Sequence, residues 1–191
     1  VSTIRKLKRP ELFLDVAEAL PNCEFRMIGG PGDGEHALFE SIKERASGMG
    51  NVQFLGFVPF SRAEEQFDRA ALFINTSDSE GFPNAFLQAW ARGVPTVSFV
   101  DAGARLDGKP VGRQVNSLEE MVATVAELVS HDPMRLKEGL HCEEYVEKNH
   151  SPDKIVELYE QVFEELMKLD SRTASRLVAR SENVNSGDLP R

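Results

Sequence analysis

Short apolar runs bounded by turn residues alternate with longer stretches of helical periodicity over the first hundred residues of the chain. This alternation is typical of βαβ units, in which helices join parallel strands. The pattern therefore predicts an α/β fold: a Rossmann-like, doubly wound parallel sheet of about six strands. The strands are expected at 1–4, 24–28, 52–55, 71–75 and 96–100, with a weak sixth near 110–115. The helices between them are expected at 10–20, 34–48, 61–70 and 83–92.

From Ser117 onward the pattern is helical only. Helical periodicity covers 117–130, 133–148 and 152–169, and Ser117 and Ser151 are suited to cap the first and last of these helices. After residue 170 large apolar residues become rare, and the chain ends in the polar stretch SENVNSGDLPR. We therefore expect one domain over 1–170 and a mobile tail over 171–191, with at most one frayed helical turn in the tail.

Composition and charge narrow the classes of partner. The chain has 191 residues, a formal net charge of −9 and two cysteines. The acidic balance gives no general attraction to nucleic acid or an anionic membrane, so an anionic ligand would need a local site. Cys23 and Cys142 are too few for a disulfide framework or a zinc site, which favours reduced thiols in a cytoplasmic protein. We expect no transmembrane segment, and because residues 1–4 resemble a strand already under way, we expect a fragment.

Two loops that follow predicted strands have an unusual composition, and parallel sheets bind ligands beyond the carboxyl ends of their strands. Residues 5–10 read RKLKRP, with four basic residues that would suit a phosphate, although a solvated turn explains them equally well. Residues 29–34 read GGPGDG. Glycines let the backbone approach a ligand, but they also form tight turns with little steric strain. This loop does not match the G-x-G-x-x-G pattern, so by itself it indicates little.

A third loop, SEGFPNAFLQAW over 79–90, leads into a helix expected to start near Pro83. The unpaired amides and the positive dipole end of that helix would face the ligand crevice and form an anion site. Asn84, Gln88 and Arg92 form a polar stripe at helical spacing, which an ordinary surface stripe explains equally well. Glu80 just before the helix is awkward beside a phosphate, unless it contacts a neutral group rich in hydroxyls.

The sequence Glu80-Gly81-Phe82-Pro83-Asn84, followed by an apolar helix and GVPTVS over 93–98, resembles the signature of a known enzyme family. The family is that of the retaining glycosyltransferases of family 4 (glycosyl transferases group 1), and the signature lies in their C-terminal, donor-binding domain. The resemblance covers about 1–169 and implies two Rossmann-like domains with the active site between them, this chain being the C-terminal one. Four further stretches resemble the family: KRPEL over 8–12, IGG over 28–30, VQFLG over 52–56, and the stretch from Tyr145 to Tyr159, which resembles its closing helices.

The resemblance implies roles for individual residues. Glu80 matches the first acid of the family's E-x7-E motif and would contact hydroxyls of the donor sugar, and Lys8 matches the phosphate-binding lysine; these two are the candidate catalytic residues. The remaining candidates would bind the donor. They are Gly29 and Gly30 in the glycine turn, Phe57 and Val58 against the base, and Gly81, Phe82, Pro83 and Asn84 at the sugar and diphosphate.

The sequence departs from the family pattern at two positions. Gln88 stands where the second acid of E-x7-E usually receives the ribose hydroxyls, and an amide can still donate and accept hydrogen bonds there. Thr3 stands where the family usually has an arginine, and Arg5 would take its place toward the diphosphate. Donor binding is therefore expected, with these two contacts altered.

The implied function is transfer of a sugar, with retained anomeric configuration, from a nucleoside diphosphate sugar to a polysaccharide or glycolipid acceptor. No metal or other cofactor is expected, and the acceptor would bind through an N-terminal domain outside this chain. The parent protein would be cytoplasmic or peripheral at the inner membrane face, and this fragment alone would turn over poorly. Three alternatives remain open: a nucleotide-binding module without catalysis, an epimerase or phosphorylase of the same architecture, and a simple receiver or flavodoxin-like domain.

Overall fold

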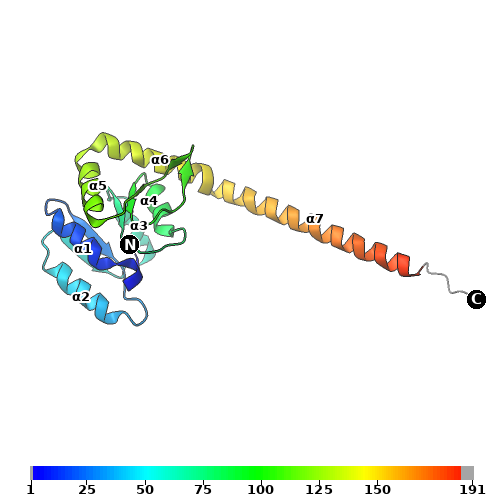
Figure 1. Ribbon diagram of the computed structural model, residues 1–191, viewed down its shortest axis with the longest axis horizontal. Coiled ribbons are helices and arrows are strands. Elements are labelled where there is room, and N and C mark those ends of the chain that lie inside the picture. Colours follow the sequence, from blue (N-terminus) through cyan, green and yellow to red (C-terminus); the bar gives the residue numbers. More distant parts are fainter. Residues whose placement is uncertain (1, 186–191) are drawn as a thin grey trace, which may run out of the picture. The chain divides into compact units, whose positions relative to one another are not determined.

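The computed structural model describes the backbone of residues 2–185 and the side chains of residues 2–168. The chain divides into two compact units, residues 1–147 and residues 148–191, which are described separately. The strands, the first five helices and most of the sixth helix belong to the first unit, and Figure 1 labels the helices along the chain. The strands are β1 (Phe25–Ile28), β2 (Val52–Gly56), β3 (Phe73–Asn75), β4 (Thr96–Ser98), β5 (Arg105–Leu106), β6 (Lys109–Pro110) and β7 (Arg113–Gln114).

All seven predicted helices are present, and each begins within two residues of its predicted start. In α4 the first helical residue is Asn84, and Pro83 is the N-cap. Both predicted serine caps are confirmed: Ser117 Oγ accepts from Glu120 N at 3.1 Å and Ser151 Oγ accepts from Lys154 N at 3.3 Å. The helices are α1 (Pro10–Ala19), α2 (His36–Ser47), α3 (Phe60–Phe67), α4 (Asn84–Trp90), α5 (Leu118–Ser130), α6 (Asp132–His150) and α7 (Pro152–Asn185).

The predicted α/β fold with parallel strands is confirmed, but the strands form separate sets. β1 pairs with β2, and β4 lies between β3 and β7, all in parallel orientation. Residues 2–4, predicted as part of the first strand, make only one isolated bridge, from Ile4 to Pro31. Ser2 N donates to the carbonyl oxygen of Ile28 at 2.9 Å, so this segment runs beside β1. β1, β3 and β4 are therefore shorter than the sequence pattern predicted, whereas β2 extends one residue further, to Gly56.

Helices cover both faces of the parallel strands. One buried cluster joins α1 and α5 and contains Met121, while another joins α3, α4 and α6 and contains Trp90. On β3, Phe73 belongs to the cluster around Trp90 and Ile74 packs against the cluster around Met121. Because successive residues of a strand point to opposite faces, the two clusters lie on opposite sides of the sheet. This is the layering of a doubly wound fold.

Residues 105–110 form an antiparallel hairpin that the sequence analysis did not predict, and the weak sixth strand near 110–115 is divided between β6 and β7. Asp107 and Gly108 connect β5 and β6 with φ angles of 51° and 75°. Two consecutive positive φ angles are required by the type I′ turn, for which Asp-Gly is a preferred pair. The dipeptide was thus the signal for this hairpin.

In the second unit, α7 continues through 171–185 to Asn185, so the expectation of at most one helical turn in the tail is wrong. Residues 171–185 contain neither glycine nor proline, and the first such residue after the helix start is Gly187. Loss of apolar periodicity removes packing but does not by itself interrupt helical hydrogen bonds. Residues 186–191 of the predicted tail lie outside the described residues. None of the described helices is both long and apolar enough to cross a membrane.

Gly139 lies in α6 at a close backbone crossing within the first unit. A Cβ atom at Gly139 would lie 2.1 Å from the carbonyl oxygen of Gly93. We predict that Gly139→Ala lowers the free energy of unfolding by about 1–3 kcal/mol, because overpacking outweighs the gain in helix propensity. Urea unfolding measures the change. Gly50→Ala is the control, since a Cβ there meets no atom within 4 Å; an equal or stabilising effect of Gly139→Ala would contradict the prediction.

Candidate functional site

Two loops, one after residues 2–4 and one at the carboxyl end of β3, are fastened to each other. The first is the basic loop, in which Lys6–Lys8 form one turn of 3₁₀-helix, and the second follows β3. Asp78 N donates to the carbonyl oxygen of Leu7 at 2.9 Å, and Thr76 Oγ1 donates to the carbonyl oxygen of Lys8 at 2.9 Å. These bonds to the backbone fix where the side chain of Lys8 begins.

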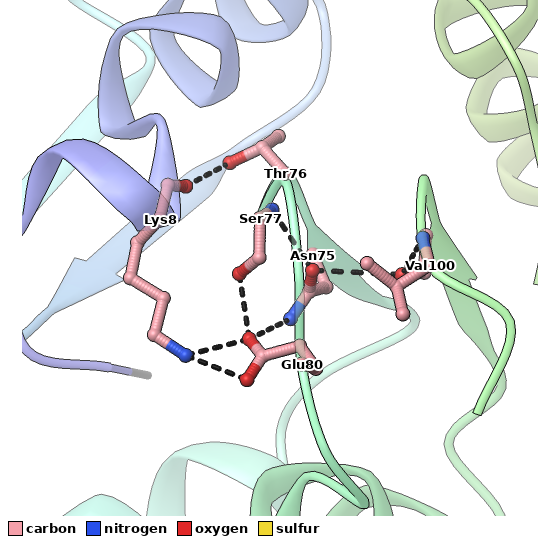
Figure 2. A network of polar contacts seen from close by, with 7 residues as sticks. Lys8, Asn75, Thr76, Ser77, Glu80 and Val100 are labelled. Atoms are coloured by element: carbon pink, nitrogen blue, oxygen red, sulfur yellow. Dashed lines mark hydrogen bonds and ion pairs between the residues drawn. The ribbon is translucent and has the colours of Figure 1, made fainter.

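Lys8 and Glu80 form an ion pair between these loops, although they are 72 residues apart in the sequence (Figure 2). Lys8 Nζ lies 2.6 Å from Glu80 Oε1 and 2.7 Å from Oε2. The side chains are 23% and 11% exposed, respectively, so the pair is largely shielded from water. The sequence analysis assigned the two residues to different parts of one ligand; in the structure they contact each other.

Burial raises the pKa of Glu80, but hydrogen bonds from Lys8, Ser77 and Asn75 outweigh this effect and hold the pKa below its ordinary value. Glu80 is therefore an ionised acceptor at neutral pH. The neighbouring charged residues Arg9 and Asp78 form an ion pair of their own, with Arg9 Nη1 at 3.0 Å from Asp78 Oδ1. Lys8 is thus the cation that contacts Glu80.

A cavity of about 200 Å³ opens beside the ion pair. Its lining includes Lys8 and Glu80 together with Pro83, Asn84 and Ala85 at the start of α4. Among the described residues, no side chain caps this end of the helix, and Phe86 N already donates to the carbonyl oxygen of Pro83 at 2.9 Å; the amides of Asn84 and Ala85 therefore remain as hydrogen-bond donors. The cavity therefore combines an ammonium group, a carboxylate and amide donors, which together suit a ligand that carries both phosphate and hydroxyl groups.

Comparison with known proteins identifies the family. The model of the family "Glycosyl transferases group 1" matches residues 1–131. The chain belongs to this family. The resemblance stated from the motifs at 8–12, 52–56 and 80–84 is thereby confirmed.

Relatives of this group 1 glycosyltransferase chain are longer than it is. A phosphatidylinositol N-acetylglucosaminyltransferase subunit of Arabidopsis thaliana is 28% identical over 170 residues, which cover 85% of this chain and 36% of that protein. The D-inositol 3-phosphate glycosyltransferase of Mycolicibacterium smegmatis is 24% identical over an alignment of 203 positions, which covers 98% of this chain and 45% of that protein. The chain spans less than half the length of the curated relatives it matches.

Solved structures confirm the fold. A mutant of S. aureus TarM, in complex with Fondaparinux, alpha-GlcNAc-glycerol and UDP, superposes with a TM-score of 0.70 at 20% identity, over 84% of this chain and 34% of TarM. The C-terminal domain of a glycosyl transferase group 1 family protein (LpcC) from Francisella tularensis gives a TM-score of 0.67 at 21% identity. That match covers 80% of this chain and 84% of the LpcC domain, so the group 1 glycosyltransferase chain has the size of a C-terminal domain.

Other predicted site residues of the group 1 glycosyltransferase chain lie outside the lining of this cavity. The Arg5 side chain packs on Gly32, where a Cβ atom would lie 2.6 Å from Arg5 Cγ. Gln88 lies half-buried within α4. The remaining predicted donor-binding residues lie in loops next to these elements: Gly29 and Gly30 follow β1, Phe57 and Val58 follow β2, and Gly81 and Phe82 precede α4.

The glycine turn and the loop after β2 approach each other. A Cβ atom at Gly30 would lie 3.4 Å from Phe57 Cβ, and Phe57 itself is 80% exposed. Gly29 passes so close to the first segment that a Cβ atom there would lie 1.7 Å from the carbonyl oxygen of Ser2. Close backbone approach therefore accounts for glycine at Gly29, and the contact of the exposed Phe57 ring with a base stays a prediction.

Sequence analysis of the group 1 glycosyltransferase chain missed Asn75 and Ser77. Ser77 Oγ donates to Glu80 Oε1 at 2.6 Å, and Asn75 Nδ2 donates to the same oxygen at 3.1 Å. The available signal was the polar triplet NTS over 75–77, which ends an otherwise apolar strand. Within the part of the chain that the structure describes, no group of three or more His, Cys, Asp or Glu residues could hold a metal ion.

Proposed function

We propose that this chain binds a nucleoside diphosphate sugar and is the donor-binding part of a retaining glycosyltransferase. The observation that carries the proposal is the convergence of Lys8 and Glu80 on one cavity at the carboxyl ends of parallel strands. Membership of the group 1 family and the likeness to TarM, which was crystallised with UDP, support it. A polysaccharide or glycolipid acceptor would bind through an N-terminal domain in a cytoplasmic protein.

The proposed roles follow from the chemistry of the residues. Lys8 and the first amides of α4 neutralise the diphosphate, whose charge increases as the bond to the sugar breaks. Glu80 accepts hydrogen bonds from sugar hydroxyls. Pro83 and Asn84, which line the cavity, contact the sugar and diphosphate, and Gly81 and Phe82 lead the chain into this position. The outer donor contacts are assigned to Arg5, Gly29, Gly30, Phe57, Val58 and Gln88 as in the family resemblance.

A thermal-shift screen with common nucleoside diphosphates (UDP, GDP, ADP, CDP and dTDP) and their parent nucleosides tests this function. A ligand that binds only the native state raises Tm, because it stabilises that state by RT ln(1 + [L]/Kd). We expect one diphosphate to raise Tm clearly more than its nucleoside at equal concentration, and we expect EDTA to leave the shift unchanged. Equal shifts for diphosphate and nucleoside would contradict the phosphate site.

A further inference from the structure

The two carboxylate oxygens of Glu80 have different surroundings. Oε1 accepts hydrogen bonds from Lys8 Nζ, Ser77 Oγ and Asn75 Nδ2, at 2.6, 2.6 and 3.1 Å. Among the described residues, the hydrogen bond to Oε2 comes from Lys8 Nζ, at 2.7 Å (Figure 2). If Lys8 turns away, Oε1 keeps two donors, whereas Oε2 becomes an acceptor without a protein donor.

Asn75 is held in one orientation by contacts at both ends of its amide. Nδ2 donates to Glu80, while Oδ1 accepts from Ser77 N at 3.0 Å and lies 3.5 Å from Ser98 Oγ. Asn75 ends β3 and stands opposite Ser98 of β4 in the parallel register. The group that holds Glu80 is therefore attached to the sheet, which positions a side chain more accurately than a loop does.

The Lys8 ammonium group has three N–H donors, and two of them are directed at the Glu80 carboxylate. One donor is left for a diphosphate, so a fuller contact with phosphate requires Lys8 to give up hydrogen bonds to Glu80. A diphosphate in the adjoining cavity carries more negative charge than one carboxylate and would compete for the ammonium. Exchange of Lys8 from Glu80 to phosphate is possible only if Glu80 remains stable without it. Ser77 and Asn75 supply that stability through two hydrogen bonds to an ionised group.

We infer that Asn75 and Ser77 are positioning residues that hold Oε1 of Glu80, and that Oε2 accepts the donor-sugar hydroxyl once a diphosphate has taken Lys8. This inference rests on the proposed function and adds to it an order of events and one acceptor atom. Sugar recognition is then coupled to phosphate recognition, because Oε2 loses its hydrogen bond from Lys8 when the diphosphate binds and accepts a sugar hydroxyl in its place.

The first test uses the ligand-free chain. A ¹³C NMR titration of the Glu80 side-chain carboxyl should show a higher pKa in Ser77→Ala than in the original chain, because a donor to the ionised form is lost. Ser77→Thr keeps the hydroxyl and should restore the lower value. Ser47→Ala is the matched control, since Ser47 Oγ donates to the carbonyl oxygen of Glu44 in α2. An unchanged pKa in Ser77→Ala would overturn the positioning role.

The second test measures binding of the diphosphate that gives the largest shift in the screen, and of its glucose and N-acetylglucosamine conjugates. In Ser77→Ala, the affinity for the preferred conjugate should fall on the order of tenfold while that for the plain diphosphate stays within about twofold. Asn75→Ala, which removes the donor without adding a charge, should give the same selective loss and serves if Ser77→Ala does not fold.

The outcomes of these tests distinguish a failure of the inference about Glu80 Oε2 from a failure of the proposed function. Equal losses for conjugate and diphosphate in both variants would overturn the assignment of Oε2, because the whole cavity would then have been disturbed. An original chain that responds to no diphosphate would overturn the proposed function, and the inference with it, whatever the titration shows. A conjugate-specific loss that Ser77→Thr reverses would support the inference.

Discussion

Replacing Lys8 with alanine is expected to remove most of the thermal stabilisation that a nucleoside diphosphate gives the chain. Hydrogen bonds to charged groups contribute about 1.5–3 kcal/mol, so affinity should fall on the order of tenfold to a hundredfold. Glu80 adds to the loss, because its carboxylate is 11% exposed and would face the diphosphate without a counter-charge. The parent nucleoside, which carries no phosphate, should bind equally weakly before and after the change.

Lys6→Ala is the matched control, because Lys6 lies in the same turn of 3₁₀-helix and outside the lining of the cavity. Both variants remove one positive charge, so any general electrostatic attraction falls equally in both. A second background, Glu80→Gln, separates the two causes: part of the Lys8→Ala loss should be recovered there. Equal losses in Lys6→Ala and Lys8→Ala would show that the diphosphate does not meet Lys8 locally.

Helices and their caps were predictable because their signals are local. Ser117 precedes an amphipathic stretch and is followed at the third position by Glu120, and both groups act as caps in the structure: Ser117 Oγ accepts from Glu120 N, and Glu120 Oε2 accepts from Asn116 N at 2.7 Å. The continuation of α7 was missed because apolar periodicity was used as the criterion. The hairpin was missed because its strands are only two residues long and depend on the Asp107-Gly108 turn.

The site was predictable as a set of residues but not as a set of contacts. Lys8 and Glu80 follow from motifs, and their convergence follows from the rule that parallel strands place their carboxyl ends together. Two features depend on the directions of side chains in two different loops. These are the ion pair between Lys8 and Glu80 and the hydrogen bonds that Asn75 and Ser77 donate to Oε1 of Glu80. No local pattern encodes these directions, because they arise from the tertiary contacts that fasten the basic loop to the loop after β3.

Trp90 links the core to the cavity through α4. Its side chain is fully buried, and its Nε1 donates to Thr96 Oγ1 at 3.2 Å. The indole packs against Phe86 at a ring distance of 5.4 Å and edge-on to Tyr145 at 5.6 Å. Phe82, just before the helix, lies 6.1 Å from the same ring. Trp90 therefore fixes the C-terminal turn of α4 and supports the loop that leads into it.

Trp90→Ala is expected to lower the free energy of unfolding by about 3–5 kcal/mol, because a large cavity replaces a buried indole and Thr96 loses a partner. This is a large part of the roughly 5–15 kcal/mol that stabilises a typical domain, so the variant should be marginally folded. Urea unfolding measures the loss, provided that the m-value is the same for both proteins.

Trp90→Phe should cost less than half as much, since an aromatic ring remains between Phe86 and Tyr145. Phe57→Ala, which truncates an aromatic residue that is 80% exposed, should change stability by less than about 0.5 kcal/mol. Similar losses for the buried and the exposed truncation would contradict the placement of Trp90 at the centre of this cluster, because only a side chain packed on all sides leaves a cavity when it is removed.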